Sequence, residues 1–392
     1  MKAQGTTSEN PTNPEVLMLS TFPPRKDGVA DYTEELMGHL SAHDPKRYAL
    51  LTFKEDVGSH SSGSGVRPFP LYNELSMRDF GWKVAKAANR RNPRVLHVQS
   101  TTFIYPRAFL TFPFFLKKRL ALVVTAHDAP GLRQFHTLPF LIPLYSRARV
   151  IITLSQSVAR SVRSLPFVNP NKVVVLHHGV DTQRFSPEVS PERFLAHYRL
   201  LKGPFTFMQP GFVGQGKGQD VLLRAFGRLK KRFPSADFRL VIAGGTRTTA
   251  DIRYAKSLSK LRDLLGLERE VVTTGYVPWS LLPSALAAAD VLAFPYLGAS
   301  QSGPLHRGLA MGKPVIVSDV PSFLEVVSDG ETGVVVPKGR VQALSEAMGE
   351  LFTDAVMRDR IGKGARSLAL SSLDWEKDAA RESEVYSSVI GD

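Results

Sequence analysis

The chain has 392 residues, of which 43% are apolar and 22% charged, so its composition is that of a soluble globular protein long enough for two domains. It contains no cysteine, which excludes disulfide bonds and thiolate metal sites. The net charge is +14, and residues 78–163 alone carry +13 through 15 basic residues and two acidic ones.

Residues 1–14 are polar and lack the apolar segment of a signal peptide, so we expect a disordered tail. No apolar run reaches the ~18 residues that a membrane-spanning helix needs. These observations predict a cytoplasmic protein. A basic segment as dense as 78–163 favours partners that carry phosphates, such as a nucleic acid, an anionic membrane or a phosphorylated substrate.

Short apolar runs rich in β-branched residues recur along the chain, with room for helices between them. Continuous apolar strands that alternate with helices are typical of parallel sheets buried on both faces. Two such series predict two Rossmann-like α/β domains, over 15–190 and 200–373, separated by a proline- and glycine-containing stretch near 185–203. The expected strands are Val16–Phe22, Tyr48–Phe53, Val95–Val98, Ala121–Thr125, Val150–Leu154, Val173–Leu176, Phe205–Met208, Phe238–Ala243, Val271–Thr274, Val291–Phe294, Val315–Val317 and Val334–Val336.

The first expected strand runs into Ser20–Tyr32, STFPPRKDGVADY, where Pro23 and Pro24 force a turn and Gly28 precedes a helix through Leu40. Amides at the start of such a helix can hold an anion or a sugar oxygen. An ordinary loop in which Gly28 adopts a positive φ explains the same residues. The residues alone leave both interpretations open.

A His-Asp pair, His127 and Asp128, follows the expected strand 121–125 almost directly. Parallel sheets bind ligands at the carboxyl ends of their strands, and a histidine there can donate a hydrogen bond or transfer a proton. A turn capped by Asp128 is the structural alternative. We favour the functional interpretation and predict that His127 and Asp128 are catalytic.

Other histidines and tryptophans show no pattern that indicates chemistry. His177 and His178 are adjacent, and neighbours on a strand point to opposite faces, which argues against a metal site. We assign no function to His97, Trp82 or Trp279.

The segment Pro210–Asp220, PGFVGQGKGQD, places four glycines between a strand and an apolar helix. Its spacing differs from a P-loop, and Gln219 stands where that motif needs a hydroxyl for magnesium. Lys217 is the one cation in this glycine-rich setting, so it can reach a diphosphate, although a solvated lysine is the alternative. We predict that Lys217, Gly211 and Gly214 bind the diphosphate.

The segment 298–315, GASQSGPLHRGLAMGKPV, contains no acidic residue. Gln301-Ser302-Gly303 should present amides and a hydroxyl at a helix N-terminus, where an anion is held without a nearby carboxylate. The chain also lacks a D-x-D pair that would hold Mg or Mn with a diphosphate, so no metal is expected. The residues predicted to bind the diphosphate through their backbone are Ser302, Gly303, Pro304 and Leu305.

The C-terminal segment 374–392 predicts an amphipathic helix. Asp374 can cap it, and acidic residues in its first turn favour the helix dipole. Its apolar residues recur at helical spacing, so one face must dock, and we expect it to dock on the first domain.

Taken in order, these stretches resemble the glycosyltransferase family 4 enzymes from about Val16 to Val389. No single motif is specific, whereas the ordered set is. The matching residues are Gly28-Val29-Ala30, Thr125–Asp128, His178–Asp181 with Phe185, Lys217-Gly218, Gly275–Val277, Ala289–Val291 with Pro295, Gly312–Val315, Glu325 with Gly330 and Gly333, and Trp375.

The resemblance implies the GT-B fold, in which two Rossmann-like domains face a central cleft and the last helix crosses back to the first domain. It implies a retaining, metal-independent enzyme with a nucleotide-sugar donor in the C-terminal domain and an acceptor in the N-terminal domain. Lys217 matches the lysine that grips the donor diphosphate, His127 the histidine that faces the sugar, and Gly28 the loop glycine at the diphosphate. The same match assigns Tyr276 and Glu325 to the donor site.

The chain departs from the family pattern at three positions. Many members have an arginine where Phe212 stands, and many have a pair of glutamates where Ala299 and Arg307 stand. Either the 302–305 backbone takes over donor binding, or donor binding has decayed. The retained lysine and histidine favour an active transferase. The alternatives are a GT-B sugar-nucleotide epimerase and a non-catalytic GT-B subunit.

The segments 103–119 and 131–149 combine aromatic and aliphatic residues with cations, a composition that suits a membrane interface. Core helices explain the apolar positions but not the charge. We therefore expect peripheral association with the inner membrane face through 78–163, and a lipid-linked or saccharide acceptor. No aromatic-basic module supports nucleic-acid binding.

Overall fold

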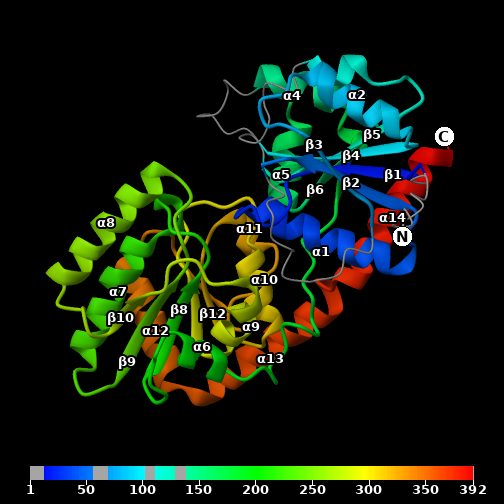
Figure 1. Ribbon diagram of the computed structural model, residues 1–392. Coiled ribbons are helices and arrows are strands. Elements are labelled where there is room, and N and C mark those ends of the chain that lie inside the picture. Colours follow the sequence, from blue (N-terminus) through cyan, green and yellow to red (C-terminus); the bar gives the residue numbers. More distant parts are fainter. Residues whose placement is uncertain (1–12, 56–68, 102–110, 129–137, 392) are drawn as a thin grey trace, which may run out of the picture. The chain divides into compact units, whose positions relative to one another are not determined.

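The computed structural model describes residues 13–55, 69–101, 111–128 and 138–391 (Figure 1). Contacts divide the chain into two units: the first takes residues up to 153, 158–175 and 379 onward, and the second takes 154–157 and 176–378. Most of the tail predicted at 1–14 lies outside the described residues, as do residues 103–110 and 131–137 of the two aromatic-basic segments. Among the described residues, no helix has both the length and the apolar content required to cross a bilayer.

The first unit is built on seven parallel strands in the order β3-β2-β1-β4-β5-β6-β7. The order reverses direction at β1 and β4, where a doubly wound sheet opens its ligand-binding crevice. Its strands are β1 (Val16–Leu19), β2 (Tyr48–Phe53), β3 (Leu71–Leu75), β4 (Val95–Ser100), β5 (Ala121–Ala126), β6 (Val150–Thr153) and β7 (Val173–Val175). Its helices are α1 (Gly28–His43), α2 (Gly81–Arg91), η1 (Phe112–Phe115), α4 (Leu138–Arg147), α5 (Gln156–Arg163), which starts in the second unit, η3 (Pro170–Lys172) and the later part of α14 (Trp375–Gly391).

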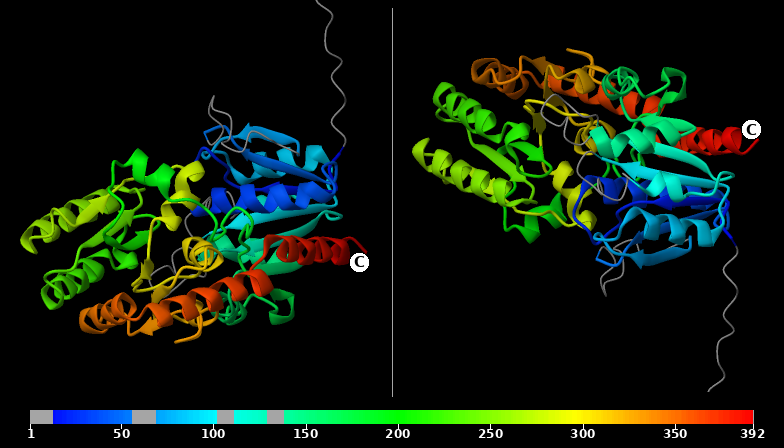
Figure 2. Two further views of the ribbon diagram at one scale, coloured as in Figure 1. Left: turned by 90° about the horizontal axis from the view of Figure 1, so that it is seen from below. Right: turned by 90° about the horizontal axis from the view of Figure 1, so that it is seen from above.

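The second unit is built on six parallel strands in the order β10-β9-β8-β11-β12-β13. Figure 2 shows its helices α7 and α8, in green, side by side. Its strands are β8 (Phe205–Pro210), β9 (Phe238–Ala243), β10 (Val271–Thr273), β11 (Val291–Phe294), β12 (Val315–Ser318) and β13 (Val334–Val336). Its helices are α6 (Glu192–His197), η4 (Gln215–Lys217), α7 (Gln219–Arg232), α8 (Thr249–Leu264), η5 (Trp279–Leu281), α9 (Leu282–Ala287), α10 (Gly303–Ala310), α11 (Pro321–Leu324), α12 (Val341–Thr353) and α13 (Ala355–Ser372).

Each expected apolar run forms a strand, because both faces of these parallel sheets are buried. β1, β2, β4 and β5 have every residue buried. The sequence analysis missed β3, an edge strand with the sequence LYNEL whose residues are mostly half-exposed. Its polar Asn73 and Glu74 break the apolar run by which the other strands were predicted.

The helix α14 begins after Asp374, whose Oδ1 accepts a hydrogen bond from the Glu376 amide at 2.9 Å. Trp375 is buried against Gly179, where any Cβ would collide with the indole ring. From Ala379 onward the helix belongs to the first unit.

Candidate active site

A glycine-rich turn, residues 211–218, follows β8 and leads into α7. Gly211 and Gly218 have φ angles of 109° and 67°, which only glycine adopts at low cost. Lys217 ends η4, and its Nζ lies 3.9 Å from the centre of the Tyr296 ring, a cation–π contact. The Leu297 amide donates to the Gly216 carbonyl at 2.9 Å, which fixes the turn to the loop after β11.

The start of α10 lies against this turn. A Cβ built on Gly211 would be 3.3 Å from Pro304 Cγ, so the absence of a side chain permits the approach. The structure therefore places the turn that carries Lys217 against the start of α10 at Pro304, and the assignment of these residues to a diphosphate site stays a prediction.

The N-terminal cap of α10 uses some of the backbone amides that were predicted to bind the diphosphate. The Leu305 amide donates to the Ser302 carbonyl at 3.0 Å and to its Oγ at 3.4 Å, and Pro304 has no N–H. Pro304 therefore has no amide to offer an anion, and the Leu305 amide is used by the cap. We expect amide contacts from Ser302 and Gly303, and the assignment of Pro304 and Leu305 to the donor stays a prediction. A Cβ on Gly303 would lie 3.2 Å from His178 Nε2 and 3.4 Å from an Arg307 guanidinium nitrogen.

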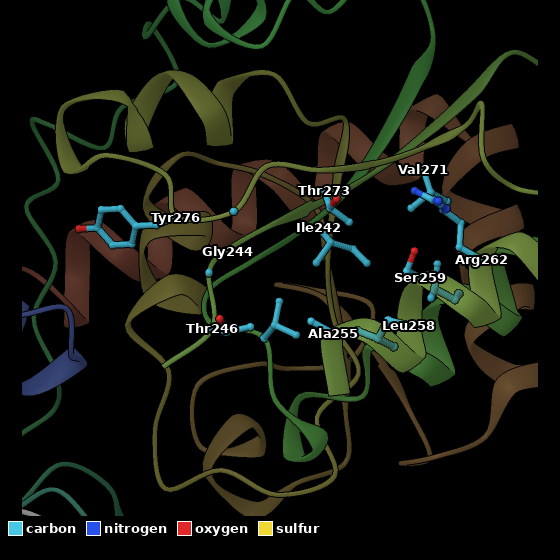
Figure 3. Close-up of a pocket in the computed structure, with 14 residues that line it drawn as sticks. Ile242, Gly244, Thr246, Ala255, Leu258, Ser259, Arg262, Val271, Thr273 and Tyr276 are labelled. Carbon is cyan, nitrogen blue, oxygen red and sulfur yellow. The ribbon is translucent and has the colours of Figure 1, made fainter. Parts of the chain in front are cut away.

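A cavity of about 460 Å³ opens at the carboxyl ends of β9 and β10 (Figure 3). Ile242 and Thr273 face the α8 residues Ala255, Leu258 and Ser259 across it. Gly244-Gly245-Thr246 and Gly275-Tyr276 also line it, and their backbones approach closely: a Cβ on Gly245 would lie 3.2 Å from Tyr276 Cβ. Largely apolar walls with a few hydroxyls suit a flat heteroaromatic ring.

The cavity adjoins the glycine-rich turn. Val213, which lies in that turn, is part of the cavity wall, and its amide donates to the Gly245 carbonyl at 2.9 Å. Gly214 lies beside α8, where a Cβ would be 3.1 Å from an Asp251 oxygen. The predicted donor residues Gly211, Gly214, Lys217 and Tyr276 therefore lie along one edge of the second unit's sheet.

Two arginines are associated with positions where the family pattern is broken: Arg307 occupies one of them, and Arg247 stacks on Phe212, which occupies another. Arg307 is 5% exposed, and its guanidinium lies 4.5 Å from the Trp279 ring centre and 5.6 Å from that of Phe185. The Arg247 guanidinium lies 4.7 Å from the ring of Phe212. Trp279, to which the sequence analysis assigned no function, thus supports the cation that replaces the family glutamate.

Glu325 has a different environment from the other predicted donor residues. Its carboxylate oxygens accept hydrogen bonds from the amides of Gln156 and Ser157, at 2.6 and 2.7 Å. Both amides belong to the 154–157 segment of the second unit. These contacts are structural, and the assignment of Glu325 to the donor stays a prediction.

In the first unit, Gly28 follows a helix cap that the sequence analysis missed. Asp27 Oδ1 accepts from the Val29 and Ala30 amides at 2.9 and 2.7 Å, and Oδ2 pairs with Arg25 Nε at 2.7 Å. The helix amides that could hold an anion are thus partly used by the protein itself. Gly28 is not among the glycines with positive φ, and a Cβ there would meet no atom within 4 Å.

His127 is buried beyond the end of β5. Its Nε2 lies 2.7 Å from Gln99 Oε1, and its ring meets the Tyr32 ring edge-on at 4.9 Å. Burial lowers the pKa of His127 to about 3, with a smaller effect from His97. The imidazole is therefore neutral at neutral pH, which argues for a hydrogen-bonding role and against a general acid.

Asp128 lies at the same strand end. Burial first, and then the charge of Asp128, raise the pKa of the nearby Tyr145 hydroxyl in α4. The catalytic assignment of Asp128 stays a prediction.

Two family models match the chain: one described as Glycosyltransferase Family 4 matches residues 26–184, and one described as Glycosyl transferases group 1 matches residues 208–354. Over 384 residues the chain is 30% identical to the GDP-mannose-dependent alpha-(1-6)-phosphatidylinositol monomannoside mannosyltransferase of Mycobacterium tuberculosis, covering 93% of this chain and 96% of that protein. The chain belongs to the family 4 glycosyltransferases.

Further relatives of this family 4 glycosyltransferase have related names. The mannosyltransferase of the same description from Mycolicibacterium smegmatis is 28% identical over 388 residues, 95% of this chain and 98% of that protein. The D-inositol 3-phosphate glycosyltransferase of Corynebacterium urealyticum is 30% identical over 222 residues, 56% of this chain and 51% of that protein. The protein is a transferase that uses a nucleotide-sugar donor, and the epimerase and non-catalytic alternatives are not supported.

Solved structures confirm the GT-B fold. Anabaena HepE in complex with UDP and glucose aligns with a TM-score of 0.79 at 18% identity, covering 95% of this chain and 99% of that chain. A glycosyltransferase from Rickettsia africae aligns with a TM-score of 0.78 at 16% identity, covering 96% and 99%. At these identities the likeness concerns the fold alone.

Proposed function

We propose that the protein is a retaining, metal-independent hexosyltransferase that moves mannose from GDP-mannose to a lipid-linked or saccharide acceptor at the inner membrane face. The observation that carries this proposal is the match along almost the whole chain to GDP-mannose-dependent mannosyltransferases. The glycine-rich turn that carries Lys217 also supports it, because Gly211 of this turn lies against Pro304 at the start of α10.

In this proposal the second unit would supply the positive charge that the donor's departing diphosphate needs. Lys217, the Ser302 and Gly303 amides and the Arg307 guanidinium would stabilise the negative charge that develops as the glycosidic bond to the diphosphate breaks. Groups that are already oriented stabilise such charge without reorganising, which makes this the main catalytic effect. The Arg247 guanidinium over Phe212 would compensate for the arginine that many relatives carry at that position.

The cavity between β9, β10 and α8 would hold the nucleoside. Its volume of about 460 Å³ falls within the range of small-ligand pockets. The adjoining glycine-rich turn would then receive the diphosphate. A leaving-diphosphate oxygen would assist deprotonation of the acceptor hydroxyl, because a pKa of about 3 makes the His127 imidazole too weak a base to take that proton.

The first unit has a surface that fits the proposed membrane association. We define the aromatic-basic face as the exposed residues of α2 and η1 with their flanks. Asn89 joins the two elements through hydrogen bonds to the Phe115 carbonyl at 2.8 Å and the Lys117 amide at 3.1 Å. Exposed aromatic rings among cations suit an anionic lipid headgroup layer. The face comprises Phe80, Trp82, Lys83, Lys86, Arg90, Phe114, Phe115, Lys117, Lys118 and Arg119.

Thermal unfolding with a panel of GDP-, UDP- and ADP-sugars tests the donor. A donor at ~100 times its Kd stabilises the folded state by about 2.7 kcal/mol, which raises the midpoint by roughly 5–11 °C. We expect GDP-mannose to give this shift and Lys217→Ala to abolish it. Arg224→Ala, an exposed cation on α7, is the matched control and should keep the shift.

Turnover measurements test the rest of the proposal. We expect mannose transfer to a polyprenyl- or inositol-linked acceptor to continue in EDTA, and NMR of the first product to show the α-anomer. If only a UDP-sugar raised the unfolding midpoint, that UDP-sugar would be the donor and the assignment of GDP-mannose would be wrong. No shift with any nucleotide sugar would contradict the proposed function.

A further inference from the structure

A chain of buried polar side chains runs through the first unit from His127 to α14. His127 Nε2 lies 2.7 Å from Gln99 Oε1, and Gln99 Nε2 lies 3.4 Å from His97 Nε2. His97 Nδ1 lies 2.7 Å from the Tyr386 hydroxyl, which donates to Glu382 at 2.6 Å. We call these five residues the His97 network. All five are buried, and burying polar groups is costly unless each is paired.

The donors and acceptors of the network can be assigned from its α14 end. Because the Tyr386 hydroxyl gives its proton to Glu382, its oxygen accepts from His97 Nδ1–H. With Nδ1 as its donor, His97 turns Nε2 to the Thr125 hydroxyl at 2.8 Å and to the Gln99 amide nitrogen at 3.4 Å, and both of those groups can donate to it. The Gln99 amide nitrogen also faces the Met18 sulfur at 3.6 Å.

This orientation of the Gln99 amide determines the state of His127. With its nitrogen turned to His97 and Met18, Gln99 presents its oxygen to His127, and that oxygen accepts only from a protonated Nε2. The Tyr32 ring, edge-on at an interplanar angle of 90°, limits rotation of the imidazole. A neutral imidazole with its proton on Nε2 carries its lone pair on Nδ1.

We propose that Gln99 is a positioning residue which, held by His97, Tyr386 and Glu382, keeps the proton of His127 on Nε2, so that Nδ1 accepts a hydrogen bond from a hydroxyl of the transferred sugar. This inference rests on the proposed function, because it takes His127 as the group that faces the sugar. It assigns a catalytic consequence to α14, whose Tyr386 is connected to His127 through two intervening side chains, His97 and Gln99.

Substitutions of Gln99 separate positioning from packing. Gln99→Met keeps the length of the side chain and removes the oxygen, and we expect kcat to fall about 10-fold or more with little change in the KM for the donor. Gln99→Glu restores an acceptor oxygen and should recover part of kcat. If Gln99 only fills the core, the buried charge of Gln99→Glu should make it the worse variant, and that order would overturn the proposal.

Two tyrosines provide a matched pair at α14. The Tyr386 hydroxyl belongs to the network, whereas the Tyr48 hydroxyl contacts the same helix at Ser383, at 3.3 Å, without bonding to His97. We expect Tyr386→Phe to lower kcat and Tyr48→Phe to leave it unchanged. Equal effects of the two variants would contradict the role of the network.

NMR of the histidine ring nitrogens tests the tautomer without a substrate. In ¹⁵N-labelled protein at pH 7.5 we expect His127 Nε2 to be protonated, and Gln99→Met to give a mixture of tautomers. A proton on Nδ1 in the unsubstituted protein would overturn the proposal even if the enzyme transfers mannose. Failure of every donor in the thermal panel would instead refute the proposed function, so the two failures are distinguishable.

Discussion

Arg307 and Arg247 both place a guanidinium over an aromatic ring. Arg307 stands at a position where this chain departs from the family pattern, and Arg247 contacts Phe212, which stands at another. The sequence shows that an acid is missing at 307 but not what the arginine contacts. Its partner Trp279 is 28 positions away and belongs to another element. The local pattern therefore predicted the charge of the site, while the packing that holds the charge became visible only in the fold.

Replacing Arg307 tests whether this buried cation stabilises the second unit. Arg307→Met keeps an unbranched apolar side chain but removes the cation–π contacts with Trp279 and Phe185. We expect the free energy of unfolding in urea to fall by about 1–2 kcal/mol. Arg224→Met, an exposed arginine on α7, should change it by less than about 0.5 kcal/mol. Equal effects of the two changes would show that the contacts with the rings contribute nothing.

Several aromatic side chains in and beside α2 and η1 are exposed to solvent. Phe114 is 75% exposed and Phe80 69%, while Phe112 in the same short helix is fully buried. Phe112 packs in the hydrophobic core, which explains why a phenylalanine stands at that position. The core does not explain Phe114 and Phe115, because their rings are exposed. Cations surround these exposed rings, and the proposed partner of this face is therefore an anionic membrane.

Vesicle sedimentation tests this face. Lys86→Ser with Lys118→Ser removes two exposed cations, each worth about 1 kcal/mol at an anionic surface, so binding to phosphatidylserine-containing vesicles at low salt should weaken about 30-fold. Neutral vesicles should bind neither protein. The control is Lys256→Ser with Lys260→Ser, which removes the same charge from α8 of the second unit. If the control variant also bound the vesicles more weakly, the net charge of the protein would account for binding and the aromatic-basic face would not.

An element or site residue can be predicted when the residues that determine it are close together in the sequence. β5 was predicted because its apolar residues are contiguous, and Lys217 because its glycines mark a close approach. β3 was not predicted because it is an edge strand in which polar residues interrupt the apolar run. The network around Gln99 and His97 was not predicted, because a polar residue within a strand does not reveal its partner in the neighbouring sequence. Tyr386, the partner of His97, lies 289 positions further along the chain.

Acid sensitivity follows from histidines that the folded molecule keeps neutral. Burial lowers the pKa of His306 to about 4, and its Nδ1 donates to the His178 carbonyl at 2.7 Å. The unfolded chain binds a proton at this residue below about pH 6.5 and the folded protein does not until about pH 4. Proton binding therefore favours unfolding in that window, and His306 should cost about 2 kcal/mol of stability between pH 6.5 and 5.

Urea unfolding at pH 7.5 and pH 5 measures this effect. His306→Asn keeps a donor for the His178 carbonyl and cannot titrate, so we expect its stability to fall about 2 kcal/mol less than that of the unsubstituted protein on acidification. His197→Asn, an exposed histidine of the same unit, should leave the difference unchanged. Identical losses in the protein and in His306→Asn would contradict the prediction.

The division of the first unit into three chain segments has a consequence for biosynthesis. A ribosome releases β1 to β7 early, but residues 379 onward emerge only after the whole second unit has been made. Until then His97 has no Tyr386 to bond and one flank of the sheet lacks its covering helix. We therefore expect the first unit to complete its native core only after α14 has emerged from the ribosome, later than its strands are synthesised.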